Sequence, residues 1–144
     1  MVTTTSTAQR PQTSPQRLAR WAIAADAAAS AVIGVLLVAA AGGLDSMLGI
    51  TYAVLVGIGV VLVAWAVELT MLLRRPSIPL PALRAIVAFN ATWLVGSIAA
   101  LAIGWDGRTG LGAAFVAVQA VGVVGFLAGQ GTALRAATRV AALS

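Results

Sequence analysis

Four long apolar segments constrain the fold of this 144-residue chain more than any other feature. The segments lie at residues 18–42, 50–73, 81–105 and 110–134. Each is close to the ~20 residues that an α-helix needs to cross roughly 30 Å of hydrocarbon. Because 60% of the residues are hydrophobic and only 9% are charged, we expect lipid to solvate most of the surface. The sequence therefore predicts four transmembrane helices.

The links between these segments are short, and this determines how the helices are connected. The links lie at residues 43–49, 74–80 and 106–109. Because so few residues join them, neighbouring helices must run antiparallel. We expect an all-α, integral membrane, antiparallel four-helix bundle over residues 17–136. Residues 1–16, rich in Thr, Ser, Gln and Pro, are expected to form a disordered cytoplasmic tail, and residues 137–144 a second tail.

Arginine supplies every basic residue, and its distribution indicates the orientation in the membrane. Eight of the nine arginines lie near the two termini or the second link, and only Arg108 lies in another link. The positive-inside rule then predicts a multi-pass protein of the inner (cytoplasmic) cell membrane with both termini in the cytoplasm. The net charge of +5 is interpreted as this topology signal, so we expect no nucleic-acid partner.

The chain contains no cysteine and no histidine. This composition excludes thiol nucleophiles, imidazole bases and most zinc sites. Only four acidic residues are present. We therefore expect no metal and no cofactor, and any chemistry must come from polar side chains within the apolar segments.

Five acidic or amide side chains lie within the apolar segments, where a charged group costs about 2.5–3.5 kcal/mol on insertion scales. They are Asp26, Glu68, Asn90, Gln119 and Gln130. With a rise of 1.5 Å per residue, Asp26 and Asn90 each lie about 12 Å inside the cytoplasmic end of their segment, in one layer. Glu68 lies roughly one to two turns nearer that end. We expect both carboxyls to face one cavity.

Helical spacing places a polar group and an aromatic or small residue on one face of every segment. The four faces contain Asp26, Ser30 and Gly34; Gly57, Val61, Trp65 and Glu68; Asn90, Trp93, Ser97 and Leu101; and Phe115, Gln119, Phe126 and Gln130. Apolar surroundings favour the protonated form of a carboxyl, which is then a general acid. Aromatic faces stabilise a cation by about 0.5–2 kcal/mol each, so such a site suits a carbocation.

This constellation resembles the small membrane-bound terpene cyclases of actinobacterial indole-terpenoid and drimane-type pathways. The resemblance covers the four spans, one acid in each of the first two segments, and the aromatic residues Trp65, Trp93 and Phe115. It implies a cofactor-independent isomerase that protonates an epoxide or alkene of a lipophilic prenylated substrate. Asp26 and Glu68 would be its catalytic acid pair. Its substrate-binding residues would be Trp65, Asn90, Trp93, Ser97, Phe115, Gln119 and Phe126.

Two other classes of function remain open. A proton-coupled exporter similar to the small multidrug-resistance proteins also has four short spans and an embedded acid, but the arginine asymmetry argues against dual topology. A non-catalytic accessory subunit of a membrane complex, similar to the DoxX-like group, would use its acids only for hydrogen bonds between helices. Small residues at four-residue spacing fit packing within the bundle or a homodimer face equally well.

Overall fold

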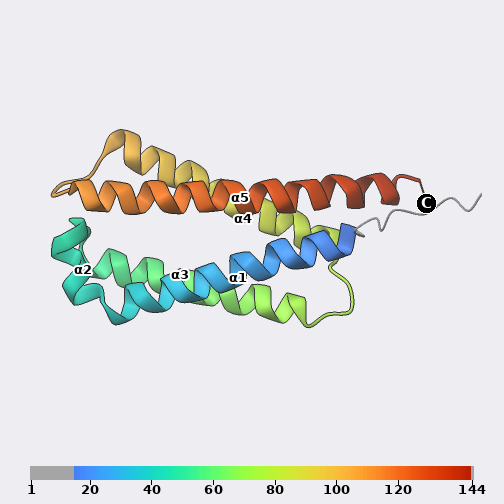
Figure 1. The fold of residues 1–144 in the computed structure, drawn as a ribbon, viewed down its shortest axis with the longest axis horizontal. Helices are drawn as coiled ribbons and strands as arrows, with labels where there is room; N and C mark the ends of the chain where they lie inside the picture. Colours follow the sequence, from blue (N-terminus) through green and yellow to red (C-terminus); the bar gives the residue numbers. More distant parts are fainter. Residues whose placement is uncertain (1–14, 144) are drawn as a thin grey trace, which may run out of the picture.

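The computed structural model describes residues 15–143, which form five helices. They are α1 (Pro15–Ala39), α2 (Ala41–Leu48), α3 (Tyr52–Leu73), α4 (Leu80–Ile103) and α5 (Gly110–Ala141). All except α2 are long and apolar enough to cross a membrane. The prediction of an all-helical chain with four helices of membrane-spanning length is therefore confirmed for the described residues, and Figure 1 shows the long helices running alongside one another.

The first link was predicted as a loop over residues 43–49, but most of it is helical. The chain bends at Ala40 (φ −109°, ψ 9°) and then forms α2. Gly49 ends α2 in the left-handed conformation (φ 63°), which favours glycine. A Cβ at Gly49 would also lie 1.9 Å from the Gly107 carbonyl oxygen. Both the backbone conformation and this close contact therefore require glycine at position 49.

The bounds of both predicted tails differ from the structure. Pro15 already belongs to α1, and residues 1–14 lie outside the described residues. At the other end, α5 continues to Ala141, so most of the tail predicted at 137–144 is helical. The last turns of α5 contain Arg135 and Arg139. Charged residues end an apolar segment in a hydropathy pattern, but here they continue the helix.

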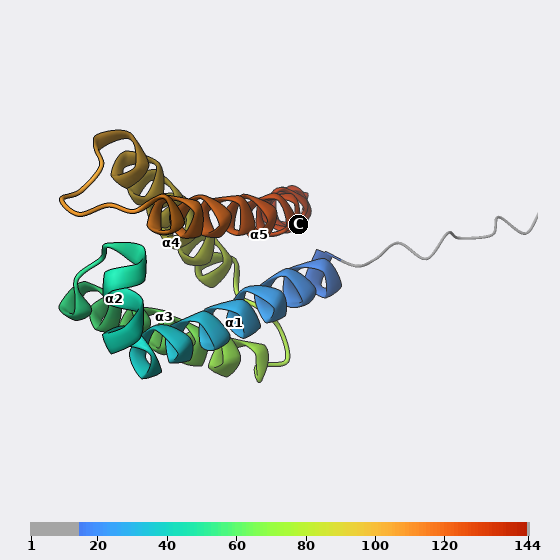
Figure 2. The same cartoon turned by 60° about the vertical axis from the view of Figure 1, so that its left-hand side comes forward.

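The long helices form two pairs that pack on each other. Helix α1 packs on α3, α4 packs on α5, and α1 also packs on α5. The backbones of α3 and α4 stay apart although the second link joins them. Figures 1 and 2 show α1, α2 and α3 in one layer and α4 with α5 in the other.

The close approach of α1 and α3 depends on two glycines. A Cβ at Gly34 would lie 2.8 Å from the Gly59 carbonyl oxygen, and a Cβ at Gly59 would lie 2.8 Å from the Gly34 carbonyl oxygen. Without side chains at these positions, the two backbones come into contact. The small residue at position 34 therefore serves packing within the bundle.

We expect Gly59→Leu to lower the free energy of unfolding by about 2 kcal/mol, because its side chain must push the backbone of α1 away. Gly57 provides a matched control on the same helix, since a Cβ there meets nothing within 4 Å and the position is exposed. Gly57→Leu should change the free energy of unfolding little. The measurement is denaturant unfolding in detergent, and equal losses for both variants would contradict the role of this contact.

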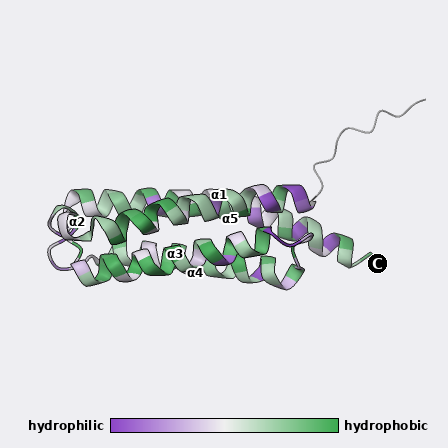
Figure 3. Ribbon diagram, turned by 90° about the horizontal axis from the view of Figure 1, so that it is seen from below, coloured by the Kyte–Doolittle hydropathy of each residue, from purple (hydrophilic) through white to green (hydrophobic). Residues whose placement is uncertain are grey.

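The outer surface of the bundle is apolar. Large hydrophobic side chains are exposed on every long helix, for example Val32, Val60, Val95 and Val118. Figure 3 shows hydrophobic residues along the helices and hydrophilic ones gathered at the start of α1 and in the links. Lipid solvates such a surface well, as expected of a multi-pass membrane protein.

Side-chain hydrogen bonds to backbone carbonyls join the helices at the end of the bundle where α1 begins. The Arg20 guanidinium donates from Nη1 to the Arg75 carbonyl (2.9 Å) and from Nη2 to the Leu73 carbonyl. The Gln16 amide accepts from the Ile78 N–H (3.1 Å) and donates to its carbonyl (3.4 Å). The bond to Leu73 satisfies a carbonyl at the end of α3 that has no partner within the helix, and the others connect α1 to the link between α3 and α4.

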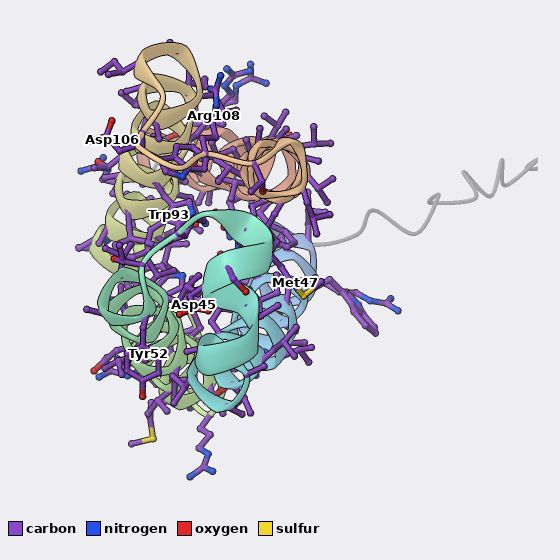
Figure 4. The ribbon with its side chains drawn as sticks, turned by 90° about the vertical axis from the view of Figure 1, so that its left-hand side faces the viewer. Asp45, Met47, Tyr52, Trp93, Asp106 and Arg108 are labelled. Carbon is purple, nitrogen blue, oxygen red and sulfur yellow. The ribbon has the colours of Figure 1, made fainter. Side chains whose placement is uncertain are left out.

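The opposite end of the bundle, which Figure 4 views directly, is joined in the same way. Trp105 Nε1 donates to the Gly49 carbonyl (2.7 Å), and Thr109 Oγ1 donates to the Met47 carbonyl (2.8 Å). The Arg108 guanidinium lies 5.7 Å from the centre of the Trp105 ring. Trp105 therefore connects the link after α4 to the link after α2.

Candidate functional site

Asp26 lies at the centre of a buried hydrogen-bond network and is only 1% exposed. Its Oδ2 accepts from Asn90 Nδ2 (2.6 Å) and from Gln130 Nε2 (2.9 Å), and its Oδ1 accepts from Ser30 Oγ (3.2 Å). Asn90 Nδ2 also donates to Gln130 Oε1 (2.9 Å). We refer to these four residues as the Asp26 network, and they join α1, α4 and α5.

The network confirms the predicted layer of Asp26 and Asn90 and adds two residues to it. Ser30 lies one turn after Asp26 on α1, on the face that helical spacing predicted. Gln130 is completely buried. The sequence identified it as an embedded polar residue but gave it no role in the site.

A depth argument would have placed Gln130 in the same layer. Asp26, Asn90 and Gln130 each lie five or six residues from an arginine at the same end of the bundle. These arginines are Arg20, Arg84 and Arg135. With a rise of 1.5 Å per residue, all three polar side chains lie about 8–9 Å inside the level of the arginines. Their equal depth is the signal that indicates a contact.

A cavity of about 270 Å³ adjoins the network, and all four long helices contribute to it. We call it the central cavity. Of the predicted site residues, it brings together Asp26, Trp65, Asn90, Trp93, Phe115, Gln119 and Phe126. Aromatic rings and aliphatic side chains make up most of the remaining wall, so the cavity fits a largely apolar molecule.

Stacked aromatic rings from α3 and α4 form one wall of the central cavity. The ring centres of Trp65 and Phe89 are 3.8 Å apart with an angle of 18° between the planes, and those of Phe89 and Trp93 are 6.2 Å apart. The rings fill the space between two helices whose backbones do not meet. The sequence interpretation missed Phe89 because it lies beside Asn90 in the chain, off the face on which Asn90 and Trp93 align.

Glu68 does not line the central cavity, so the expectation that both carboxyls face one cavity is wrong. Its side chain is exposed and lines a separate cavity of about 360 Å³ that also contains Arg75. Trp65 lines both cavities. The physical reason is that Trp65, three residues earlier on α3, occupies the inward position and stacks on Phe89. The depth of Glu68 along its helix had suggested that it lies close to Asp26. The rotation of α3 about its axis instead turns Glu68 away from the central cavity.

Ser97 is also absent from the central cavity. It lines a third cavity of about 340 Å³, which we call the distal cavity. Its hydroxyl donates to the Trp93 carbonyl one turn earlier (2.9 Å), a common arrangement for serine within a helix. Ser97 therefore does not contact the same space as Asp26, contrary to the single binding site expected from the sequence.

Two buried N–H groups beside the central cavity have no hydrogen-bond partner among the described residues. They are Trp65 Nε1 and Gln119 Nε2, and both residues line the cavity. A buried donor without an acceptor costs about 1–3 kcal/mol. The Gln119 amide rotates about a broad terminal torsion, so its N–H can turn toward a bound molecule. An apolar ligand that carries an acceptor oxygen would satisfy these groups.

The hydrogen bonds also define which oxygen of Asp26 can carry a proton. Amide nitrogens only donate, so the two amide donors at Oδ2 leave no place for a proton there. The hydroxyl of Ser30 both donates and accepts, so Oδ1 can be protonated without breaking the network. The arrangement therefore provides one defined atom that can release and regain a proton beside an apolar cavity.

Comparisons of the chain with protein-family models, with curated proteins and with solved structures find no match. They therefore do not test the resemblance to membrane-bound terpene cyclases. Any function proposed for the chain rests on the residues of the central cavity and the Asp26 network.

Proposed function

We propose that this protein is a membrane-embedded, cofactor-independent cyclase that protonates an epoxide or alkene of a lipophilic prenylated substrate. The observation that supports this most is the aromatic central cavity beside Asp26, whose Oδ1 is the oxygen able to carry a proton. A carboxylic acid, aromatic rings and exclusion of water are the elements that carbocation chemistry requires.

In the proposed reaction, Asp26 Oδ1 transfers its proton to the epoxide oxygen. The C–O bond at the more substituted carbon breaks, the oxygen becomes a hydroxyl, and a neighbouring double bond attacks the cationic carbon to close a ring. The final cation loses a proton to the Asp26 carboxylate, which restores the acid. No atom is gained or lost overall, so the product is an isomer of the substrate.

The surrounding residues support the two charges that exist during the reaction. Asn90, Gln130 and Ser30 donate hydrogen bonds to the Asp26 carboxylate after it has lost its proton. The faces of Trp65, Phe89 and other rings around the cavity stabilise the positive charge on the substrate by about 0.5–2 kcal/mol each. Gln119 binds the substrate oxygen through its unpartnered Nε2–H.

Glu68 takes no part in this mechanism, because it is exposed and lines another cavity. The acid pair implied by the resemblance is therefore reduced to the single carboxyl of Asp26. This assignment makes Glu68→Gln a control in every activity measurement, since it changes an acid within a span without touching the central cavity.

The function is tested with detergent-purified protein and terminal epoxides of prenyl chains with two to four isoprene units. Gas chromatography with mass spectrometry should reveal products of unchanged mass whose retention and fragmentation differ from those of the substrate. Formation of the diol alone, or no product, would overturn the proposal. Gradient-driven uptake of lipophilic cations by proteoliposomes would instead support the exporter, since a carboxylate among aromatic rings also suits a bound cation.

We also propose that both termini and the link between α3 and α4 lie in the cytoplasm. The arginine-rich end of the bundle, where Arg20 bonds to the Arg75 carbonyl, supports this orientation. Reporter fusions at the two termini and at Ser77 should read cytoplasmic. Fusions at Ser46 and Gly107 should read external. An external signal at Ser77 would contradict the proposed orientation.

A further inference from the structure

The distal cavity lies beside the central cavity, toward α2, and its lining includes the exposed residues Thr92 and Gly96. Both cavities are lined by Phe89, Trp93, Phe115 and Gln119, so they are direct neighbours. The far part of the distal cavity is lined by residues near the α2 end of the bundle, including Ile50 and Ala100. Because the cavities share these walls, we expect one elongated molecule to extend from one into the other.

The two hydroxyl groups around the distal cavity offer no free donor. Thr92 Oγ1 donates to the Ala88 carbonyl (2.9 Å), and Ser97 Oγ donates to the Trp93 carbonyl (2.9 Å). The unpartnered donor, Gln119 Nε2, lies on a residue common to both cavities. An occupant with one polar end would therefore place that end at Gln119 or beside Asp26 and its hydrocarbon in the distal cavity.

We infer that the distal cavity binds the hydrocarbon tail of the substrate and sets the longest chain that the protein accepts. The identity of the occupant as a prenyl chain rests on the proposed function. Lipid solvates a hydrocarbon tail about as well as the cavity does, so burial of the tail brings little hydrophobic gain. Discrimination by length is therefore steric: a tail that exceeds the cavity cannot place its reactive end beside Asp26.

Gly96 is the residue through which this limit can be changed. It lines the distal cavity, and a Cβ at this position would meet nothing within 4 Å. Gly96 is exposed, so a larger side chain has open space at its Cβ and can extend over the distal cavity that Gly96 lines. It reduces the room for the tail while the central cavity and the Asp26 network stay unchanged, because Gly96 contributes to neither.

The test compares Gly96→Phe with Gly125→Phe in detergent. Gly125 is a matched control, because it is exposed, a Cβ there also meets nothing within 4 Å, and it lines neither cavity. The probes are prenyl alcohols with two, three and four isoprene units, and binding is measured by isothermal titration. Gly96→Phe should bind the longest alcohol about 10-fold or more weakly and the shortest alcohol as the parent does. Gly125→Phe should bind all three like the parent.

Equal binding of all lengths by Gly96→Phe, or an equal loss at every length, would overturn the inference. Unfolding of each variant without ligand identifies a general loss of structure, and Gly96→Leu repeats the test if Gly96→Phe does not fold. Since the alcohols lack the epoxide, length-selective binding without cyclisation of epoxides would refute the proposed function alone. Cyclisation with unchanged length selectivity in Gly96→Phe would refute the tail site alone.

Discussion

Asp26→Asn should lower the turnover of a prenyl epoxide about 10²-fold or more, the loss expected when a general acid is removed. An amide has nearly the shape of the carboxyl but holds no acidic proton. Its oxygen can accept from Asn90 and Gln130, and its nitrogen can donate to the Ser30 hydroxyl, so the network keeps its hydrogen bonds. The loss is therefore one of chemistry and should leave folding intact.

The measurement is initial rate of cyclisation by gas chromatography at matched concentrations of folded protein. Glu68→Gln is the control and should retain the parent rate within about 2-fold, because its side chain is outside the central cavity. Parent-like turnover by Asp26→Asn would make Asp26 a structural residue. A loss of turnover in Glu68→Gln alone would identify Glu68, in the cavity that Arg75 also lines, as the catalytic acid.

Gln130→Leu should lower the free energy of unfolding by about 2 kcal/mol, within the range for buried polar groups that lose a hydrogen-bond partner. Leucine fills a similar volume but removes one of the two amide donors of Asp26 Oδ2. It also removes the acceptor of Asn90 Nδ2. Denaturant unfolding in detergent, followed by tryptophan fluorescence, measures this change.

Gln119→Leu is the matched control for this prediction. It makes the same substitution on the same helix, but the amide nitrogen of Gln119 has no partner to lose. Its free energy of unfolding should stay the same or rise, because removing an unsatisfied buried donor relieves a cost of about 1–3 kcal/mol. Equal losses in the two variants would show that the amides fill space and that their hydrogen bonds contribute little.

The four long helices could be predicted from the sequence because lipid imposes a length on each apolar segment. Helix α2 could not, since its glycines and Asp45 fit a link as well as a helix. It forms where α3 and α5 provide a surface on which to pack. This is a tertiary effect that local composition does not contain.

The sequence predicts how deep the polar residues of the candidate site lie in the bundle, but not which way every side chain points. Counting residues from the ends of the segments placed Asp26 and Asn90 in one layer, and their hydrogen bond confirms it. The same count placed Glu68 too close to Asp26, because it does not determine how far α3 is rotated about its axis. Phe89 and the distal cavity depend on the distance between α3 and α4, which no periodicity in the sequence specifies.

The Asp26 network also has a consequence for biogenesis, because its members enter the membrane at different times. The ribosome delivers α1 and α3 first, and the glycine contact between them involves neither α4 nor α5. At that stage Ser30 is the network partner that Asp26 has, since Asn90 and Gln130 arrive with the last two spans. A nascent or truncated chain therefore presents an acid to lipid that the finished chain covers. Incomplete molecules therefore differ from complete ones by an acid that Asn90 and Gln130 do not cover.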